Sequence, residues 1–109
     1  VFLLTQSYYK QLIEAGVRVY EYTPGFVHSK TFVCDDEIAT VGTINLDYRS
    51  LYLHFENGLF LYNNDTVMDI KKDILDTLED CNRIMPEMCK KNMFFLLLQG
   101  ILRIFAPLL

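Results

Sequence analysis

The sequence predicts an α/β fold, in which a mixed β-sheet is flanked by helices. Residues 17–22 (VRVYEY) alternate between apolar and polar side chains, as a half-buried strand does. Residues 31–41 contain two short apolar runs on either side of a polar DDE segment, which is typical of a β-hairpin. Residues 64–85 repeat apolar side chains at spacings of three and four, which predicts an amphipathic helix. This alternation of strands and helices favours layered α/β architecture.

Length and composition narrow the function classes. The chain has 109 residues, enough for one domain, and 51% of them are hydrophobic, which excludes a disordered chain. The formal net charge of −4 lacks the basic balance of a general nucleic-acid binder, so we expect no nucleic-acid partner. The three cysteines form no CxxC pair and no zinc spacing, so we expect reduced, structural cysteines in a cytosol-facing protein.

The remaining elements are predicted from local signals. Residues 1–4 form an apolar run that predicts a buried strand, and because it begins without a Met or a basic segment we interpret the chain as a piece of a longer protein. A helix should follow and end at Gly16 in the left-handed conformation. Residues 42–50 should form a polar loop or a short helical turn. We expect one sheet, built from residues 17–22, 31–34, 38–41 and 55–62.

The helix predicted over residues 64–85 should pack on that sheet. Its apolar stripe contains Val67, Ile70, Ile74 and Leu78, and Cys81 and Met85 continue the same spacing. Its other face is rich in Asp and Glu, which is typical of a solvated helix face.

Residues 93–109 (MFFLLLQGILRIFAPLL) are distinct in composition, so we divide the chain into a portion of an α/β domain at residues 1–92 and a C-terminal apolar helix at 93–109. The segment is broken by Gln99, Gly100, Arg103 and Pro107, whereas a spanning helix needs about 20 apolar residues. Two interpretations remain equally supported. The helix lies in the plane of a membrane interface, or it packs as a core helix.

The residues that could take part in catalysis lie between positions 28 and 45 (HSKTFVCDDEIATVGTIN). His28 and Lys30 are two apart, so on an extended chain they point to the same side. A hairpin over 31–41 would return the segment from Gly42 to Asn45 beside them. An imidazole can act as a nucleophile or as a general acid and base, and Lys, Thr and Asn can donate to phosphate oxygens. Gly42 would allow a ligand to approach the backbone closely. The pattern favours phosphoryl or phosphatidyl transfer through histidine.

This pattern resembles the HKD motif of the phospholipase D superfamily. The six matching residues, at the motif's spacing, are His28, Lys30, Asp35, Gly42, Thr43 and Asn45. The superfamily usually has Ser where this chain has Thr43, so the hydroxyl is kept. The segments EAGVRVYEYTPGFVHSKTFV, ATVGTINLDYRSLYLHFENGLFLY and RIFAPLL resemble the C-terminal end of bacterial cardiolipin synthases. The resemblance covers essentially the whole chain.

The resemblance implies a role for each motif residue. His28 would be the general acid and base, because in two-motif members the histidine of the first motif is usually the nucleophile. Lys30 would hold the transferring phosphate. Asp35 would support the catalytic group, and Glu56 would accept a hydrogen bond from the catalytic imidazole. The remaining phosphate ligands would be Thr43, through its hydroxyl, and Asn45. His54 has no support from the motif and is interpreted as a structural residue.

The resemblance also implies partners. Two phosphatidylglycerol molecules would yield cardiolipin and glycerol through a phosphohistidine intermediate. No metal and no cofactor are implied, because the cationic lysine and the other donors would take the place of a metal. The first HKD motif would come from the N-terminal half of the same enzyme, and the enzyme would lie at the bacterial cell membrane with its catalytic domain facing the cytoplasm. Two alternatives stay open: a phospholipase D-type phosphodiesterase or nuclease that uses water, and a non-catalytic membrane-associating fragment that works through residues 93–109. Single-motif members of the superfamily act as symmetric dimers.

Overall fold

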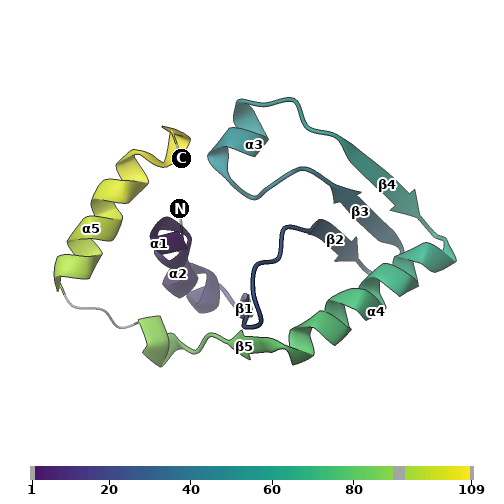
Figure 1. Cartoon of the computed structure of the whole chain (residues 1–109), viewed down its shortest axis with the longest axis horizontal. Helices are drawn as coiled ribbons and strands as arrows, with labels where there is room; N and C mark the ends of the chain where they lie inside the picture. Colours follow the sequence, from purple (N-terminus) through teal and green to yellow (C-terminus); the bar gives the residue numbers. More distant parts are fainter. Residues whose placement is uncertain (1, 90–92, 109) are drawn as a thin grey trace. The chain divides into compact units, whose positions relative to one another are not determined.

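The computed structural model describes residues 2–89 and 93–108. They form two compact units, which we call unit 1 (Val1–Glu21 with Asn82–Leu109) and unit 2 (Tyr22–Cys81). Small antiparallel sheets and flanking helices make up the fold, so the predicted α/β class is confirmed (Figure 1).

The sheet of unit 2 carries the predicted motif. It contains β2 (Lys30–Cys34), β3 (Ile38–Gly42) and β4 (Gly58–Tyr62), which are antiparallel in the order β2-β3-β4. Lys30 lies opposite Gly42, and Gly42 lies opposite Gly58. The predicted hairpin over 31–41 is therefore confirmed, and the strand expected at 55–62 begins three residues late.

The β2–β3 turn is made by two aspartates with positive φ, 52° at Asp35 and 59° at Asp36. Positive φ at both central positions is the signature of a type I′ turn, whose twist matches that of the strands it joins. Aspartate tolerates this region better than most residues because its short side chain bonds locally. Lys71 Nζ lies 2.6 Å from Asp36 Oδ1 and connects the turn to the neighbouring helix.

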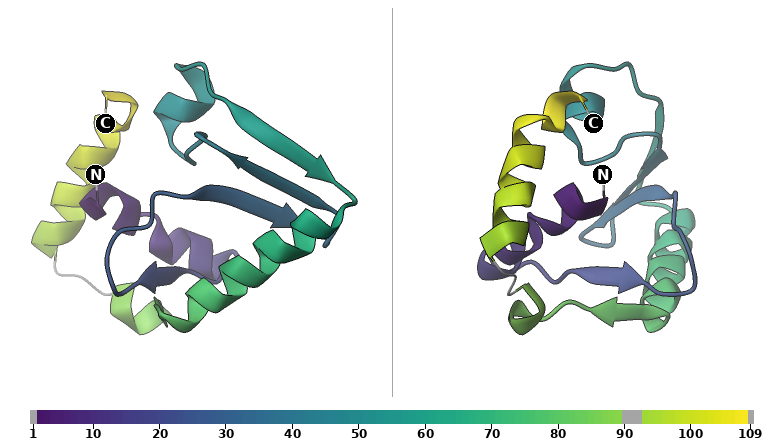
Figure 2. Two further views of the ribbon diagram at one scale, coloured as in Figure 1. Left: turned by 45° about the vertical axis from the view of Figure 1, so that its right-hand side comes forward. Right: turned by 60° about the vertical axis from the view of Figure 1, so that its left-hand side comes forward.

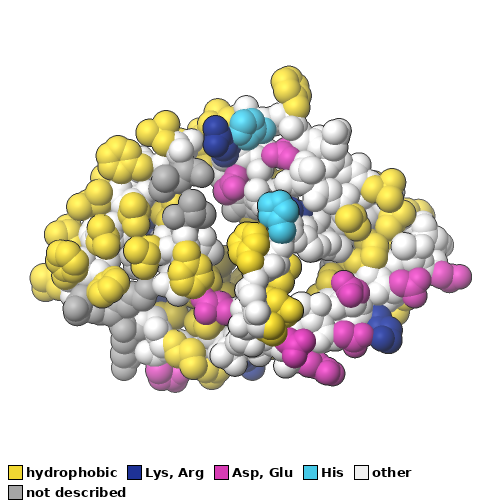
Figure 3. Space-filling view, viewed as in Figure 1, with side chains coloured by type: hydrophobic (Ala, Val, Ile, Leu, Met, Phe, Trp, Pro, Cys, Tyr) yellow, Lys and Arg dark blue, Asp and Glu magenta, His cyan; other side chains and the backbone are white. Residues whose placement is uncertain are grey.

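That helix is α4 (Asp65–Glu79), which contacts all three strands (Figure 2). Val67 on the helix and Ala39 on the central strand are both completely buried. Burying a valine side chain stabilises a fold by about 1.5–3 kcal/mol. Ile70, Ile74 and Leu78 are half-buried along the same stripe, so the predicted packing face is confirmed. Acidic side chains gather along the outer side of α4 (Figure 3).

The connection from β3 to β4 contains one short helix, α3 (Tyr48–Tyr52). The Asp47 carboxylate caps it by accepting a hydrogen bond of 2.7 Å from the backbone N–H of Ser50. The short helical turn expected in this segment is present, and it begins at the end of the predicted range.

One expectation about the strands and one about helix α4 were wrong. β1 (Tyr20–Tyr22) pairs with β5 (Cys81–Arg83) in a separate two-stranded sheet, so the strands do not form one sheet. The helix predicted to reach Met85 ends at Glu79. The apolar spacing continues through Cys81, but pairing with β1 satisfies the backbone of residues 81–83 in place of helical hydrogen bonds.

Unit 1 begins with helices. α1 (Phe2–Gln6) occupies the segment predicted to be a buried strand, so that prediction was wrong. α2 (Tyr9–Glu14) follows, and Gly16 has φ of 94°, which confirms the left-handed residue expected there. The rest of the unit contains η1 (Pro86–Cys89), α5 (Met93–Ile104) and η2 (Ala106–Leu108).

Helix α5 turns its polar side chains inward. Gln99 is only 6% exposed and donates to the Leu3 carbonyl (3.4 Å), and Arg103 Nε donates to Ser7 Oγ (3.0 Å). The outer face is apolar, with Met93 85% and Ile104 75% exposed, and hydrophobic side chains gather over this helix in Figure 3. Among the described residues, no helix is long and apolar enough to cross a membrane.

Candidate active site

His28 and Lys30 contact each other directly. Lys30 is the first residue of β2, and its Nζ lies 2.8 Å from His28 Nδ1 and 2.6 Å from the His28 carbonyl oxygen. An ammonium group has donors and no acceptor, so Nδ1 must be the accepting nitrogen. A neutral imidazole in this arrangement carries its proton on Nε2. The contact thus leaves Nε2–H as the hydrogen-bond donor of the ring, and the ring must become an imidazolium before it can act as a general acid.

One face of the His28 ring stacks on an aromatic neighbour. The rings of Phe26 and His28 stack with centroids 5.9 Å apart at an interplanar angle of 30°. Phe26 is 85% exposed, so it reaches the imidazole from the solvent side of the chain. Sequence reasoning missed this contact, although the spacing of two residues on an extended segment was the available signal.

Thr43 closes the base of the loop that carries Asn45. Its backbone N–H donates to the Asn57 carbonyl (2.9 Å), and its hydroxyl oxygen accepts from the Asn57 N–H (3.1 Å). The hydroxyl also donates to Glu56 Oε2. A hydroxyl has one proton to donate, so in this state it is directed to Glu56. Asn45 is exposed in the closed loop.

The Glu56 carboxylate accepts a hydrogen bond from the Thr43 hydroxyl. Hydrogen bonds from Thr43 and then Ser50 lower the pKa of Glu56, the nearby His54 lowers it further, and the negative charge of Asp47 raises it. Among the described residues, none of the hydrogen bonds given for Glu56 reaches the His28 imidazole. The expected contact between Glu56 and the catalytic ring stays a prediction.

Gly42 is required by the sheet. A Cβ at Gly42 would collide with the Asn57 carbonyl oxygen and would lie 2.7 Å from Gly58 Cα. The close approach here is therefore between two strands of the protein. This steric reason is enough to require glycine here, and the expectation that Gly42 admits a ligand stays a prediction.

Asp35 lies apart from the other motif residues. It follows the last residue of β2, whereas Lys30 is the first, so roughly 16 Å of strand separates them. Its carboxylate accepts a weak hydrogen bond from Cys34 Sγ (3.5 Å), and this bond raises the pKa of the Cys34 thiol. The structure thus brings His28 and Lys30 together, and Thr43 and Glu56 together, and places Asp35 in the hairpin turn.

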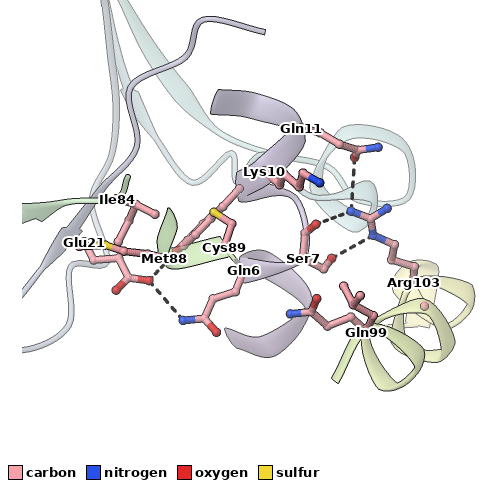
Figure 4. A pocket seen from close by; sticks show the side chains of 13 residues that line it. Gln6, Ser7, Lys10, Gln11, Glu21, Ile84, Met88, Cys89, Gln99 and Arg103 are labelled. Atoms are coloured by element: carbon pink, nitrogen blue, oxygen red, sulfur yellow. Dashed lines mark hydrogen bonds between the residues drawn. The ribbon is translucent and has the colours of Figure 1, made fainter. Parts of the chain in front are cut away.

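A separate cavity of about 490 Å³ lies in unit 1 (Figure 4). Tyr9 donates to Glu21 Oε1 (2.9 Å) at its edge, and burial together with that carboxylate raises the pKa of Tyr9. Arg103 bonds Ser7 and lies over the Tyr8 ring, 4.3 Å from its centroid. None of the predicted motif residues lines this cavity. Within residues 2–89 and 93–108, no group of His, Cys, Asp and Glu is arranged to hold a metal ion.

Comparison with known proteins identifies the family. The family model described as "Cardiolipin synthase, PLD-like domain" matches residues 2–78. The chain belongs to this family. Cardiolipin synthase of Halalkalibacterium halodurans is 43% identical over all of the chain, and cardiolipin synthase 2 of Bacillus anthracis is 37% identical over all of it. An uncharacterized protein of Streptococcus mutans is 47% identical over 99% of the chain.

The chain spans 22%, 21% and 24% of the lengths of these three relatives, in that order. No solved structure gives a significant match. The family and the mixed α/β fold agree with the resemblance stated from the sequence.

Proposed function

We propose that this chain supplies the second HKD motif of a phosphatidyltransferase that makes cardiolipin and glycerol from two phosphatidylglycerol molecules. The proposal is supported by family membership and by relatives named cardiolipin synthase over the whole length of the chain. Because the chain spans about a fifth of those relatives, the remainder of the active site, including the first motif, would come from the rest of the enzyme.

In the first step, the histidine of the first motif attacks phosphorus of one phosphatidylglycerol. The bond to the glycerol oxygen breaks, the His28 imidazolium gives its Nε2 proton to that oxygen and becomes a neutral ring, and a phosphatidyl-histidine remains. In the second step, the free glycerol hydroxyl of another phosphatidylglycerol gives its proton to His28 and attacks the same phosphorus. The phosphohistidine bond breaks and cardiolipin forms, which returns both histidines to their starting states.

The contact between Lys30 and His28 is the observation that carries this assignment. Lys30 Nζ lies at Nδ1, and a neutral imidazole is too weak an acid to protonate the leaving oxygen, so the ammonium must leave Nδ1 before the ring can become the imidazolium that the first step needs. A phosphate diester brings negative oxygens that compete for the ammonium. We therefore propose that substrate draws Lys30 from the imidazole to the phosphate, where its charge stabilises the transition state.

The proposed roles of the other predicted residues are supported to different extents. Asn45, exposed in the loop closed by Thr43, is proposed as a phosphate ligand. Thr43 acts as a phosphate donor only if its hydroxyl leaves Glu56, so its supported role is to hold the loop. Asp35 is proposed to hold the hairpin turn. We propose that the enzyme works at the cytoplasmic face of the bacterial membrane, where both lipid substrates would be found.

The test uses a chimeric enzyme, in which this chain replaces the matching 110 residues of the Halalkalibacterium halodurans enzyme. It is expressed in a bacterium without its own cardiolipin synthases and supplied with labelled phosphatidylglycerol. We expect labelled cardiolipin and free glycerol. His28→Ala should reduce the rate by a hundredfold or more, since general acid–base catalysis is typically worth about 10²–10⁴-fold.

His54→Ala is the matched control, because His54 is also an exposed histidine of unit 2 but lies outside the motif. It should keep most of the activity. Labelled phosphatidic acid as the product would show that water is the acceptor, and an active His28→Ala variant would overturn the assignment of the acid and base.

A further inference from the structure

We infer that unit 1 binds the headgroup of a membrane phospholipid in its cavity, with the lipid phosphate on Arg103 and the acyl chains along the apolar outer face of α5. The inference goes beyond the proposed function, because none of the HKD residues lines this cavity. It assigns a ligand to the inner side of α5 and a membrane surface to its outer side.

The cavity has the size and the lining of a small-molecule site. Its volume of about 490 Å³ falls within the range of about 300–1,000 Å³ that is usual for ligand pockets. Its lining combines apolar side chains with polar and charged ones that converge from α1, α2 and α5 (Figure 4). The charged members are Lys10, Glu21 and Arg103.

Arg103 is held in place while part of its guanidinium remains available. Its Nε donates to Ser7 Oγ (3.0 Å), and its Nη2 donates to the Ser7 carbonyl and to Gln11 Oε1 (3.3 Å). A guanidinium has five donors, so both N–H groups of Nη1 are left without a partner among the described residues. None of the ion pairs within that part of the chain involves Arg103. A fixed arginine with two unused donors is well suited to a phosphate group.

The charges of the lining favour an anion at the Arg103 end. Lys10 supplies a second cation, and its pair with Glu14 is long, at 3.9 Å, and exposed, so little energy is lost when the ammonium moves to a ligand. The acidic side chain of the lining, Glu21, lies at the opposite end of the cavity from Arg103 (Figure 4). The cations therefore meet the phosphate without a carboxylate beside them.

The Glu21 end favours a headgroup that donates hydrogen bonds. Glu21 Oε1 accepts from Tyr9 (2.9 Å) and Gln6 (3.4 Å). An ionised carboxylate has about four acceptor sites, so Glu21 can accept further hydrogen bonds from a ligand. The hydroxyls of a glycerol headgroup supply such donors, whereas the quaternary ammonium of choline has none. Phosphatidylglycerol thus suits both ends of the cavity, and phosphatidylcholine suits only the phosphate end.

Gly100 leaves a path from the cavity to the outer face of α5. It lies inside the helix and lines the cavity, and a Cβ added there would meet no atom within 4 Å. Glycine in a helix interior is destabilising relative to alanine, and no close approach of the described chain requires it here. Leu96, one turn earlier, lines the same cavity and is 56% exposed. The space over Gly100 is where the lipid would pass from its headgroup to its acyl chains.

The outer face of α5 carries a stripe suited to those chains. Exposed apolar side chains recur at spacings of four, four and three, which keeps them on one side of the helix; they are Met93, Leu97, Ile101 and Ile104. A continuous apolar surface of this kind marks a site of contact with a protein or a membrane. The phosphate site beside it favours a membrane, because a phospholipid presents an anionic phosphate and hydrocarbon in one molecule.

The test follows occupancy of the cavity through Cys89, which lines it. The chimeric enzyme is purified in non-ionic detergent with the His28→Ala change, so that lipid is not consumed. Alkylation of each cysteine by N-ethylmaleimide is then timed by mass spectrometry, without and with lipid. We expect phosphatidylglycerol to slow alkylation of Cys89 severalfold. Cys34, which is exposed in unit 2, is the internal control and should react at an unchanged rate.

Other probes identify which part of the lipid is bound. Phosphatidylcholine with the same acyl chains should protect Cys89 more weakly than phosphatidylglycerol, and equal protection would overturn the role of Glu21. Diacylglycerol and inorganic phosphate should each give no protection. If either protects Cys89 as well as phosphatidylglycerol does, the site recognises hydrocarbon alone or a free anion, and the assignment to a phospholipid headgroup is wrong.

Two variants test the path and the second cation. Gly100→Leu introduces a good helix former and more apolar surface, so it should preserve the melting temperature and any non-specific attachment to lipid. It should nevertheless abolish the effect of phosphatidylglycerol on Cys89, because leucine blocks the path. Lys10→Gln should weaken that effect severalfold. Lys72→Gln is its matched control, since Lys72 is also an exposed lysine with a partner four residues later.

Unchanged protection of Cys89 in both Gly100→Leu and Lys10→Gln, or no protection of the unaltered cavity, would overturn the inference. Failure of the proposed function gives a different result. An enzyme that makes no cardiolipin would still show protection of Cys89, because the measurement needs no turnover.

Discussion

The Lys30 ammonium is bonded to the His28 imidazole, with Nζ 2.8 Å from Nδ1 and 2.6 Å from the His28 carbonyl oxygen. The hydrogen bond to the His28 carbonyl oxygen holds the Lys30 side chain beside the same histidine, because a single residue separates the two on an extended segment. Lys30 can therefore influence both the tautomer of the ring and the charge at the phosphate.

We predict that Lys30→Ala lowers the rate of cardiolipin formation by roughly a hundredfold or more. The variant loses the fixed positive charge at the transferring phosphate, which is usually among the largest contributions to such reactions. The rate is measured with labelled phosphatidylglycerol in membranes at matched expression. Lys72→Ala is the control, because Lys72 pairs with Asp76 on the exposed face of α4. Equal rates for the two variants would contradict the role of Lys30.

Asp35→Asn should keep nearly full activity. Asparagine adopts the left-handed conformation as readily as aspartate, so the turn with φ of 52° is preserved while the charge is lost. Asp35→Val should instead destabilise the protein, because a β-branched residue is strained at positive φ. Thermal unfolding and activity are measured together. An inactive but stable Asp35→Asn would mean that the carboxylate takes part in the chemistry.

Gly42→Ala should be strongly destabilising, while Gly58→Ala should be nearly neutral. The added Cβ at Gly42 collides with backbone atoms of Asn57 and Gly58, whereas at Gly58 the nearest atom is the Val41 carbonyl oxygen at 3.7 Å. Overpacking of this kind typically costs about 1–3 kcal/mol. The two glycines face each other in the register, so they form a matched pair for thermal unfolding. Similar melting temperatures for the two variants would contradict this prediction, because they would show that β3 and β4 separate easily at Gly42.

Tyr9→Phe should destabilise the protein by about 1 kcal/mol below pH 10, through loss of the hydrogen bond to Glu21. The pKa of Tyr9 is raised in the folded state, so the folded protein holds this proton more tightly than the unfolded chain does. The stabilisation is then complete below the ordinary tyrosine pKa, and it is lost progressively as pH rises from there through the raised pKa of the folded state. Denaturant unfolding at several pH values checks this, with exposed Tyr62→Phe as the control. A pH-independent difference would contradict the assignment.

Local patterns predicted the sheet hairpin and α4 well, because both depend on side-chain periodicity and turn residues close in sequence. The apolar stripe through Val67 and Ile74 identified the packing face correctly. The same periodicity misplaced the end of α4, since the chain leaves the helix at Asp80 to pair Cys81–Arg83 with a strand nearly sixty residues earlier. The run at residues 1–4 was too short to distinguish a strand from a helix.

The site was predictable in part. Spacing indicated that His28 and Lys30 share one side, and their contact is present. Spacing could not indicate that Thr43 directs its hydroxyl to Glu56, because this depends on how the loop over residues 43–57 folds back to Asn57. The steric reason for Gly42 likewise requires the position of a neighbouring strand.

The inverted polarity of α5 has a practical meaning for protein engineering. Solubilising a protein usually means replacing exposed apolar residues and leaving the polar ones alone, on the assumption that the polar ones already face water. Here Gln99 and Arg103 are the residues to preserve, because they bond Leu3 and Ser7. Leu97 and Ile104, at 65% and 75% exposure, are the positions where Glu or Lys would improve recovery from the aqueous phase without disturbing the helix contacts.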